Sequence, residues 1–177
     1  MLKDHACGEL DGSQVGKVVK LAGWVAKRRD HGGLIFIDLR DSTGIVQIVF
    51  DSEVSVDAHK LANQLRSEWV ISVFGEVNYR PEGTENLNLV SGHVEVKINE
   101  IEVLNESKTP PFYINDESDN VDELLRMKYR YLDLRRSKMF SIMKLRHQIV
   151  RYIRNFLNDK GFLEVETPIL IKSTPEG

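Results

Sequence analysis

The chain has 177 residues, of which 41% are hydrophobic and 29% charged, close to the proportions of ordinary globular domains. This composition excludes a disordered tail, and no apolar run approaches the roughly 20 residues of a membrane helix. The first fifteen residues lack the apolar stretch of a signal peptide, and Cys7 is the single cysteine. We therefore expect a cytoplasmic protein without disulfides and without a paired-cysteine zinc site.

The formal net charge of −3 argues against a protein that binds nucleic acid by bulk electrostatic attraction. The charge is unevenly distributed, however. Residues 126–154 hold ten Lys or Arg side chains and one acid, Asp133, a local net charge of +9 that leaves −12 for the rest of the chain. Charge alone leaves two interpretations of this segment open, a contact with a polyanion or a solvated helical face.

Five segments are rich in β-branched and aromatic residues, alternate between apolar and polar positions, and predict five β-strands. They span residues 17–27, 34–40, 44–50, 69–79 and 93–104. Residues 41–44 predict a hairpin turn in which Gly44 is free to take a positive φ. Residues 56–65 predict a short amphipathic helix. The order of three strands, a helix and two strands is that of an OB-fold, a Greek-key barrel that commonly binds oligonucleotides.

The character of the sequence changes after Leu104. Residues 105–111 contain two adjacent prolines, which cannot donate to a sheet ladder, so a linker is expected there. Residues 121–136 resume a helical pattern. No internal repeat or low-complexity segment is visible.

A longer helix is predicted to begin with Ser137 as its capping residue, because apolar side chains recur at spacings of three and four between Phe140 and Leu157. Gly161 is expected to end it. Residues 162–166 then alternate like a strand. One helix and one short strand bury too little surface to form a domain. We therefore expect a complete barrel followed by the opening elements of a larger unit.

The segment 27–40 combines three cations, a glycine turn and Phe36 on the following strand. Cations for phosphates, a close-approaching backbone and an aromatic ring for base stacking are what single-stranded RNA binding requires. Gln47, on the paired strand, offers both a donor and an acceptor to a base edge. Two alternatives remain open: Phe36 as an ordinary core residue, and the basic triplet as a solvated loop. Composition alone favours the first alternative, because an aromatic residue within an apolar strand is usually part of the core.

Several strings, in their order and spacing, resemble bacterial-type aspartyl-tRNA synthetases over essentially the whole chain. They are Gly23-Trp-Val25, Arg28-Arg-Asp30, residues 34–41, 44–47, 128–136 and 161–168, and Thr174-Pro-Glu-Gly177. Lysyl- and asparaginyl-tRNA synthetases share the barrel and the proline-bearing strand, but residues 128–136 and 174–177 are more similar to the aspartyl enzymes.

This resemblance implies a mainly β fold with added helices. It consists of a five-stranded OB-fold Greek-key barrel that binds the anticodon over residues 1–107, and a helical hinge over residues 108–136. The first helix and strand of a class II synthetase catalytic domain follow over residues 137–177. A stand-alone single-stranded nucleic-acid-binding protein without enzymatic activity is the alternative, and residues 137–177 argue against it because a binding module has no need of them.

The resemblance also implies roles for individual residues. Phe36 is expected to stack on the central anticodon uridine, with Arg29 and Gln47 as its hydrogen-bonding neighbours. Glu95 is expected to read the first anticodon base, with Arg80 nearby.

Further roles belong to the catalytic part of the family. Pro168 is implied at a homodimer interface, and Glu176 in a mobile loop that contacts L-aspartate. The whole enzyme would use ATP and Mg²⁺. The Arg-x-Glu and Gly-rich motifs that serve ATP would lie beyond Gly177, so we expect no catalytic residue, no metal and no cofactor in this part, and no activity from it alone.

Two positions bear on which tRNA is accepted. Family members restricted to tRNA(Asp) tend to carry a leucine after the Arg-Asp pair and a lysine in the loop before the last strand. This chain has His31 and Gly83 there. The combination resembles non-discriminating enzymes that also charge tRNA(Asn). The alternative is that His31 lies in a tight turn and Gly83 is a loop glycine.

Overall fold

The structure is a computed structural model that describes residues 1–115, 121–170 and 172–173. The chain divides into two compact units, Met1–Pro111 and Phe112–Gly177. None of the described helices combines the length and the apolar character that a bilayer-spanning helix needs.

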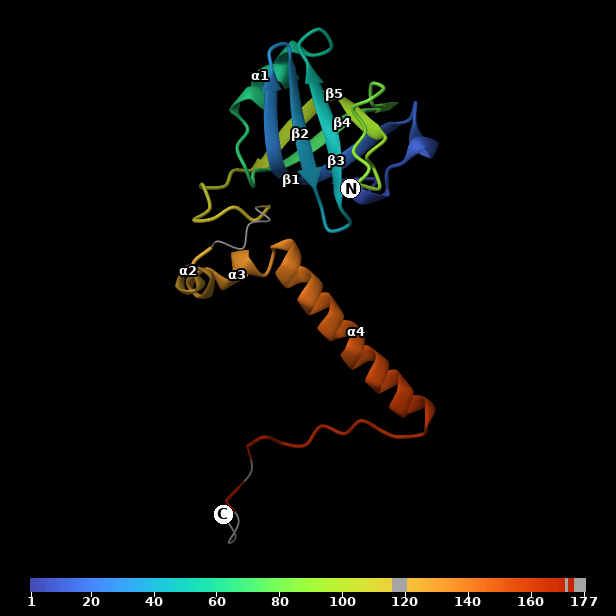
Figure 1. The fold of residues 1–177 in the computed structure, drawn as a ribbon, viewed down its shortest axis with the longest axis vertical. Coiled ribbons are helices and arrows are strands. Elements are labelled where there is room, and N and C mark those ends of the chain that lie inside the picture. The colour runs from blue at the N-terminus through green and yellow to red at the C-terminus, as the bar shows by residue number, and fades with distance from the viewer. Residues whose placement is uncertain (116–120, 171, 174–177) are drawn as a thin grey trace. The chain divides into compact units, whose positions relative to one another are not determined.

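The first unit is built on a closed five-stranded barrel (Figure 1). Its strands are β1 Val18–His31, β2 Leu34–Arg40, β3 Ile45–Asp51, β4 Val70–Tyr79 and β5 Val94–Asn105. The order around the barrel is β1-β2-β3-β5-β4, and only β3 and β5 pair in parallel. Helix α1, Val56–Gln64, packs against β2, β3 and β5. The predicted OB-fold is confirmed, and every element except β1 ends within one residue of its predicted limits.

Strict alternation explains why these segments form a barrel. On β2, Ile35, Ile37 and Leu39 are fully buried, while the residues between them are partly exposed. Buried apolar side chains from all five strands, Phe50 of β3 among them, pack together inside the barrel, and Ala62 of α1 joins the same core. Burying each large aliphatic side chain stabilises the fold by about 1.5–3 kcal/mol.

Strand β1 contains a bulge that changes which of its residues face outward. Its Cα partners on β2 step from Leu39 to Asp38 while β1 steps from Val25 to Lys27, so Ala26 is the inserted residue. Because strand side chains alternate with a period of two, one extra residue exchanges the two faces. The odd-numbered residues of β1 therefore face the core before the bulge and face outward after it.

The turn between β2 and β3 corrects the expectation for Gly44. Gly44 does not have a positive φ. It lies against the N-terminal segment instead, where a Cβ at Gly44 would come within 2.9 Å of the Gly8 Cα. The turn therefore needs a glycine there for close approach rather than for backbone freedom.

The N-terminal segment forms two short 3₁₀ helices, η1 Cys7–Glu9 and η2 Gly12–Gln14, which the sequence did not predict. Asp41 fastens η1 to the barrel by accepting hydrogen bonds from the Lys3 Nζ at 2.5 Å and from the Cys7 N–H at 3.0 Å. Burial acts to raise the pKa of Asp41, but hydrogen bonds from Lys3 and Thr43 outweigh it and hold this pKa well below its ordinary value. Burial, together with the nearby Asp41 carboxylate, raises the pKa of the Cys7 thiol to about 12.

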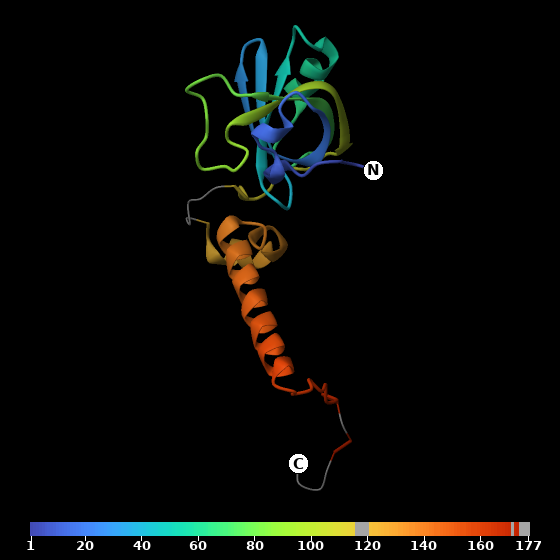
Figure 2. The ribbon, with the colours of Figure 1, turned by 90° about the vertical axis from the view of Figure 1, so that its right-hand side faces the viewer.

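The loop between β4 and β5, residues 80–93, projects from the barrel wall (Figure 2). Its base is fixed by backbone hydrogen bonds from the Arg80 N–H to the His93 carbonyl at 3.0 Å and from the Asn86 N–H to the Gly92 carbonyl at 3.0 Å. Gly92 permits that closure, because a Cβ there would collide with the Asn86 carbonyl oxygen. The loop is thus an organised part of the barrel.

The described part of the second unit contains three helices, α2 Glu123–Lys128, α3 Arg130–Asp133 and α4 Ser137–Asp159. The helical pattern predicted over residues 121–136 is thus realised as two short helices. The break falls at Tyr129, whose φ of −113° and ψ of 46° lie outside the helical region. At the start of α2, the Asp122 side chain accepts a hydrogen bond from the Leu125 N–H at 3.1 Å.

The structure confirms the predicted C-terminal end of α4 but not its predicted N-cap residue. The prediction that Ser137 caps the helix is wrong by one residue, since Arg136 is the extended N-cap residue and Ser137 is already helical. At the other end, Gly161 has a φ of +84°. The Phe162 N–H reaches back to the Leu157 carbonyl at 3.1 Å, which completes a Schellman-type end and confirms the prediction.

The strand predicted over residues 162–166 is not formed. These residues have no regular secondary structure and their side chains are exposed. A strand needs a neighbouring strand for its backbone hydrogen bonds, and within the described part of the chain none pairs with this segment. Helix α4 likewise has no buried residue.

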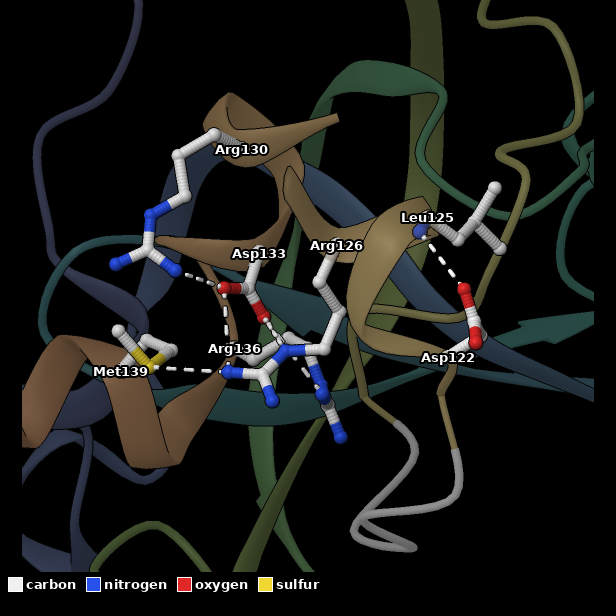
Figure 3. A network of polar contacts seen from close by, with 7 residues as sticks. All are labelled: Asp122, Leu125, Arg126, Arg130, Asp133, Arg136 and Met139. Atoms are coloured by element: carbon white, nitrogen blue, oxygen red, sulfur yellow. Dashed lines mark hydrogen bonds and ion pairs between the residues drawn. The ribbon is translucent and has the colours of Figure 1, made fainter. Parts of the chain in front are cut away.

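A buried carboxylate ties the helices of the second unit together (Figure 3). Asp133 is fully buried and accepts hydrogen bonds from the Arg126 Nε at 2.9 Å and from an Arg130 guanidinium nitrogen at 2.6 Å. A nitrogen of Arg136 lies 3.7 Å from the same carboxylate. Asp133, the single acid of the basic segment 126–154, therefore lies next to three arginines of that segment.

Candidate nucleic-acid interface

Phe36 lies on the outer face of the barrel. It stands between the buried Ile35 and Ile37 on β2, is partly exposed and is not part of the hydrophobic core. Its place follows from the strand alternation, because inward and outward positions must succeed each other. The core alternative left open for Phe36 is thus wrong, and an aromatic ring is available on the barrel surface.

The bulge in β1 brings a cation and an imidazole beside this ring. Arg29 is the cross-strand partner of Phe36. His31 faces the same way, and its ring meets that of Phe36 edge to face, with centroids 5.6 Å apart and an interplanar angle of 79°. Between β1 and β2 the chain reverses over Gly32, whose φ of +74° most other residues would find strained.

A continuous chain of polar contacts links four strands, from Arg29 on β1 to Glu95 on β5. The Arg29 guanidinium donates to Asp38 Oδ1 at 2.6 Å and to Gln47 Oε1 at 3.2 Å. The Gln47 Nε2 donates in turn to Glu95 Oε2 at 2.8 Å. Gln47 and Glu95 are only 9% and 5% exposed, so the far end of this chain is held rigidly.

The parallel pairing of β3 and β5 explains how Gln47 meets Glu95. The two residues are direct partners in that short ladder although 48 positions separate them in sequence. Both lie between core residues of their strands, so both point outward. Asp38, two residues after Phe36 on β2, shares the face as well, and its role was not predicted from the sequence.

Arg80 follows the end of β4 and comes close to the same group. Its Nε donates to the Val94 carbonyl at 3.0 Å. Burial lowers the pKa of Arg80, and the carboxylates of Glu95 and Asp38 act to raise it. An arginine remains charged throughout this range, so the face carries two guanidinium groups and two carboxylates.

The other predicted site residues lie apart from this face or outside the description. Gly83, in the loop between β4 and β5, has a φ of +83°, and a Cβ there would meet open space. Pro168 lies in the exposed irregular segment of the second unit. Glu176 is outside the described residues. Over residues 1–115, 121–170 and 172–173, no three His, Cys, Asp or Glu side chains gather so as to hold a metal ion.

The outer face formed by Phe36 and Asp38 of β2, Gln47 of β3 and Glu95 of β5, together with Arg29 from the adjoining β1, is here called the β2–β3–β5 face. It offers a coherent set of groups. An exposed ring can stack on a base, and beside it lie donors and acceptors in a fixed arrangement. Such a combination suits an unstacked base of a single-stranded loop, whose edges are open to hydrogen bonding.

Comparison with known families agrees with this geometry. Residues 19–104 match the family described as OB-fold nucleic acid binding domain, and residues 122–177 match tRNA synthetases class II (D, K and N). The chain is 58% identical over all 177 residues to the aspartate–tRNA(Asp/Asn) ligase of Syntrophomonas wolfei and 56% identical to that of Thermodesulfovibrio yellowstonii. The chain belongs to the class II aspartyl-tRNA synthetase family. It spans about 30% of the length of these relatives and corresponds to their N-terminal part.

Solved structures of class II synthetases share the fold of this part of the family. The asparaginyl-tRNA synthetase of Pyrococcus horikoshii, in complex with asparaginyl-adenylate, matches with a TM-score of 0.83 and 31% identity over 97% of this chain and 38% of its own. The aspartyl-tRNA synthetase of Entamoeba histolytica, at 21% identity and a TM-score of 0.84, is alike in fold.

Proposed function

We propose that the barrel binds the anticodon loop of tRNA(Asp), and also that of tRNA(Asn), through the β2–β3–β5 face. The observation that carries this proposal is Phe36, an aromatic ring outside the core with Arg29, Gln47 and Glu95 gathered beside it. Phe36 stacks on the central uridine, while Arg29 and Gln47 hydrogen-bond to that base.

Glu95 reads the first anticodon base. A carboxylate only accepts hydrogen bonds, and the Watson–Crick edge of guanine presents adjacent N–H donors, so the two are complementary. Arg80 beside Glu95 supplies a positive charge for the neighbouring phosphate. Arg29 and Arg80 place two positive charges at the binding face itself, which reconciles RNA binding with a chain whose formal net charge is −3.

The whole enzyme, on this proposal, activates L-aspartate with ATP and Mg²⁺ and transfers it to the terminal ribose of the tRNA. The match of residues 122–177 to class II synthetases supports this over a stand-alone binding protein. The described residues offer no metal-binding cluster and hold neither of the ATP motifs, so no step through ATP or Mg²⁺ is assigned to them. Glu176 would contact the aspartate, and Pro168 would lie at the interface of a homodimer.

Acceptance of tRNA(Asn) rests on His31 and Gly83. Several relatives above 55% identity carry the name aspartate–tRNA(Asp/Asn) ligase. His31 is held against Phe36, and an imidazole can donate or accept, so it tolerates either pyrimidine as the third anticodon base. Gly83 leaves open space where a long cationic side chain could otherwise probe that base.

Equilibrium binding to RNA stem-loops tests the proposal. The 177-residue chain should bind stem-loops with the anticodons of tRNA(Asp) and tRNA(Asn) alike, and it should lose affinity when the central uridine is replaced by cytidine. One replaced base should cost about 1–3 kcal/mol of binding free energy. Equal affinity for the uridine and cytidine loops at one salt concentration would overturn it.

A further inference from the structure

Asp38 occupies a particular place on the β2–β3–β5 face. It accepts a hydrogen bond from the Arg29 guanidinium at 2.6 Å, shorter than the 3.2 Å contact between Arg29 and Gln47 Oε1. The Asp38 side chain is 22% exposed and that of Arg29 35% exposed, so their ion pair is partly desolvated. A short, charge-assisted bond of this kind restrains Arg29 more strongly than its longer contact with the neutral Gln47 amide.

The restraint matters because a second carboxylate stands one side chain away. Arg29 donates to Gln47, and Gln47 donates to Glu95 at 2.8 Å. Glu95 is nine-tenths buried and would attract any mobile guanidinium within reach. An Arg29 released from Asp38 therefore has a competing partner, and pairing with it would cover the oxygens of Glu95.

We propose that Asp38 is a positioning residue of the anticodon site, which holds Arg29 away from Glu95 and so keeps the Glu95 carboxylate open as an acceptor for the first anticodon base. The inference rests on the proposed function and deepens it. Asp38 acts through Arg29 and touches no base itself. It also fixes the Gln47 amide, because an oxygen directed at Arg29 leaves the nitrogen directed at Glu95.

The test compares two carboxylates that lie on one hairpin and face opposite sides of it. Asp38→Asn removes the charge that holds Arg29. Asp30→Asn is the matched control, because Asp30 pairs with Arg28 at 2.8 Å and the same charge is lost. Both variants change the net charge equally, so a general electrostatic effect on RNA binding would appear in both.

The readout is affinity for two stem-loops that carry guanine or inosine as the first anticodon base. Inosine lacks the 2-amino group of guanine. The ratio of the affinity for the guanine loop to the affinity for the inosine loop therefore reports directly on whether the Glu95 carboxylate is open as an acceptor. Asp38→Asn should weaken binding of the guanine loop roughly tenfold and bring the ratio close to one, a loss of the size of one charged hydrogen bond. Asp30→Asn should change neither value. Asp38→Glu, which keeps the carboxylate, should retain most of the ratio.

A double-variant cycle separates positioning from simple structural support. In an Arg29→Gln background, Asp38→Asn should have no further effect on the ratio, because there is no guanidinium left to restrain. An unchanged ratio in a folded Asp38→Asn protein, or additive losses in the cycle, would overturn the inference. Wild-type protein that does not distinguish guanine from inosine would contradict the proposed role of Glu95, and the inference would fail with it; this result is visible before any variant is made.

Discussion

Alternation along a single strand decides the role of the aromatic residue on which the site depends. Because Ile35, Ile37 and Leu39 face the core, Phe36 must face outward, although composition alone favoured a core position for it. The strand that carries Phe36 could be predicted from the sequence. The contact between Gln47 and Glu95 could not, because it depends on the register of a parallel ladder between distant strands. Asp38 was missed for a related reason: its importance lies in its partner, Arg29, and that pairing depends on a bulge.

Replacing the aromatic ring separates a surface role from a core role. Phe36→Ala should weaken stem-loop binding by about 1–3 kcal/mol, the usual loss for one stacked base. Its melting temperature should stay close to that of the wild type, since the ring lies outside the core. Phe74→Ala is the control, because Phe74 is a 40%-exposed phenylalanine on β4 and should leave RNA affinity unchanged. A loss of about 3–5 kcal/mol in stability with normal RNA affinity would instead indicate a core residue.

Selectivity between the two tRNAs should depend on His31 and Gly83. His31→Leu combined with Gly83→Lys should shift aminoacylation by the full-length enzyme toward tRNA(Asp) by roughly 1–3 kcal/mol. Lysine at a φ of +83° carries about 1–2 kcal/mol of backbone strain, so Gly83→Ala serves as the control that has the strain without the cation. A wild-type preference for tRNA(Asp) of about a hundredfold, or about 2.7 kcal/mol, would defeat this account.

The barrel elements other than β1 were predicted almost to the residue, because their apolar and polar positions alternate over the whole length of each element. The failures have physical causes. The bulge at Ala26 could not be predicted, because the residues that follow it on β1 are all polar and show no alternation with apolar residues. Residues 162–166 form no strand because none of the described strands pairs with them. The predicted boundaries at residues 107 and 136 remain predictions.

The N-terminal segment gives a prediction that concerns one element, η1. Asp41→Asn weakens the contacts to Lys3 and Cys7 and should loosen η1 from the barrel. Cys7 is fully buried and its thiol pKa is raised to about 12, so in the wild type it should react with a thiol reagent only when the segment opens. The variant should react about ten times faster or more, as expected when about 1.4 kcal/mol of local stability is lost.

Acid should have the same effect on this element as the substitution. The pKa of Asp41 is lowered by folding, so its stabilisation is complete above the unfolded-state value near 4 and is lost as the pH falls through the lower folded-state value. Opening of η1 should therefore increase below about pH 4 in the wild type and change less in Asp41→Asn. Equal thiol reactivity of the two proteins at neutral pH would show that Asp41 does not hold the segment.

For the whole molecule, we propose that the exposed apolar side chains of α4 pack against other protein in the full-length enzyme. Large apolar residues such as Phe140, Val150 and Ile153 are 39–55% exposed along it. On the proposal of a homodimer, Ile153→Glu should convert the full-length enzyme to monomers and lower its activity, whereas Gln148→Glu, on the opposite side of α4, should leave the dimer intact. Light scattering distinguishes them, and a wild-type monomer would contradict the proposed interface.

One face of the barrel is proposed to read the anticodon, and the most direct test is to map the RNA on the protein. Backbone amide chemical shifts of the 177-residue chain, titrated with the tRNA(Asp) stem-loop, should change most around Arg29, Phe36, Gln47 and Glu95. The exposed aromatic residues Trp24 and Phe74 on β1 and β4 serve as the internal comparison. Changes concentrated around Trp24 and Phe74, with the β2–β3–β5 face unaffected, would contradict the account.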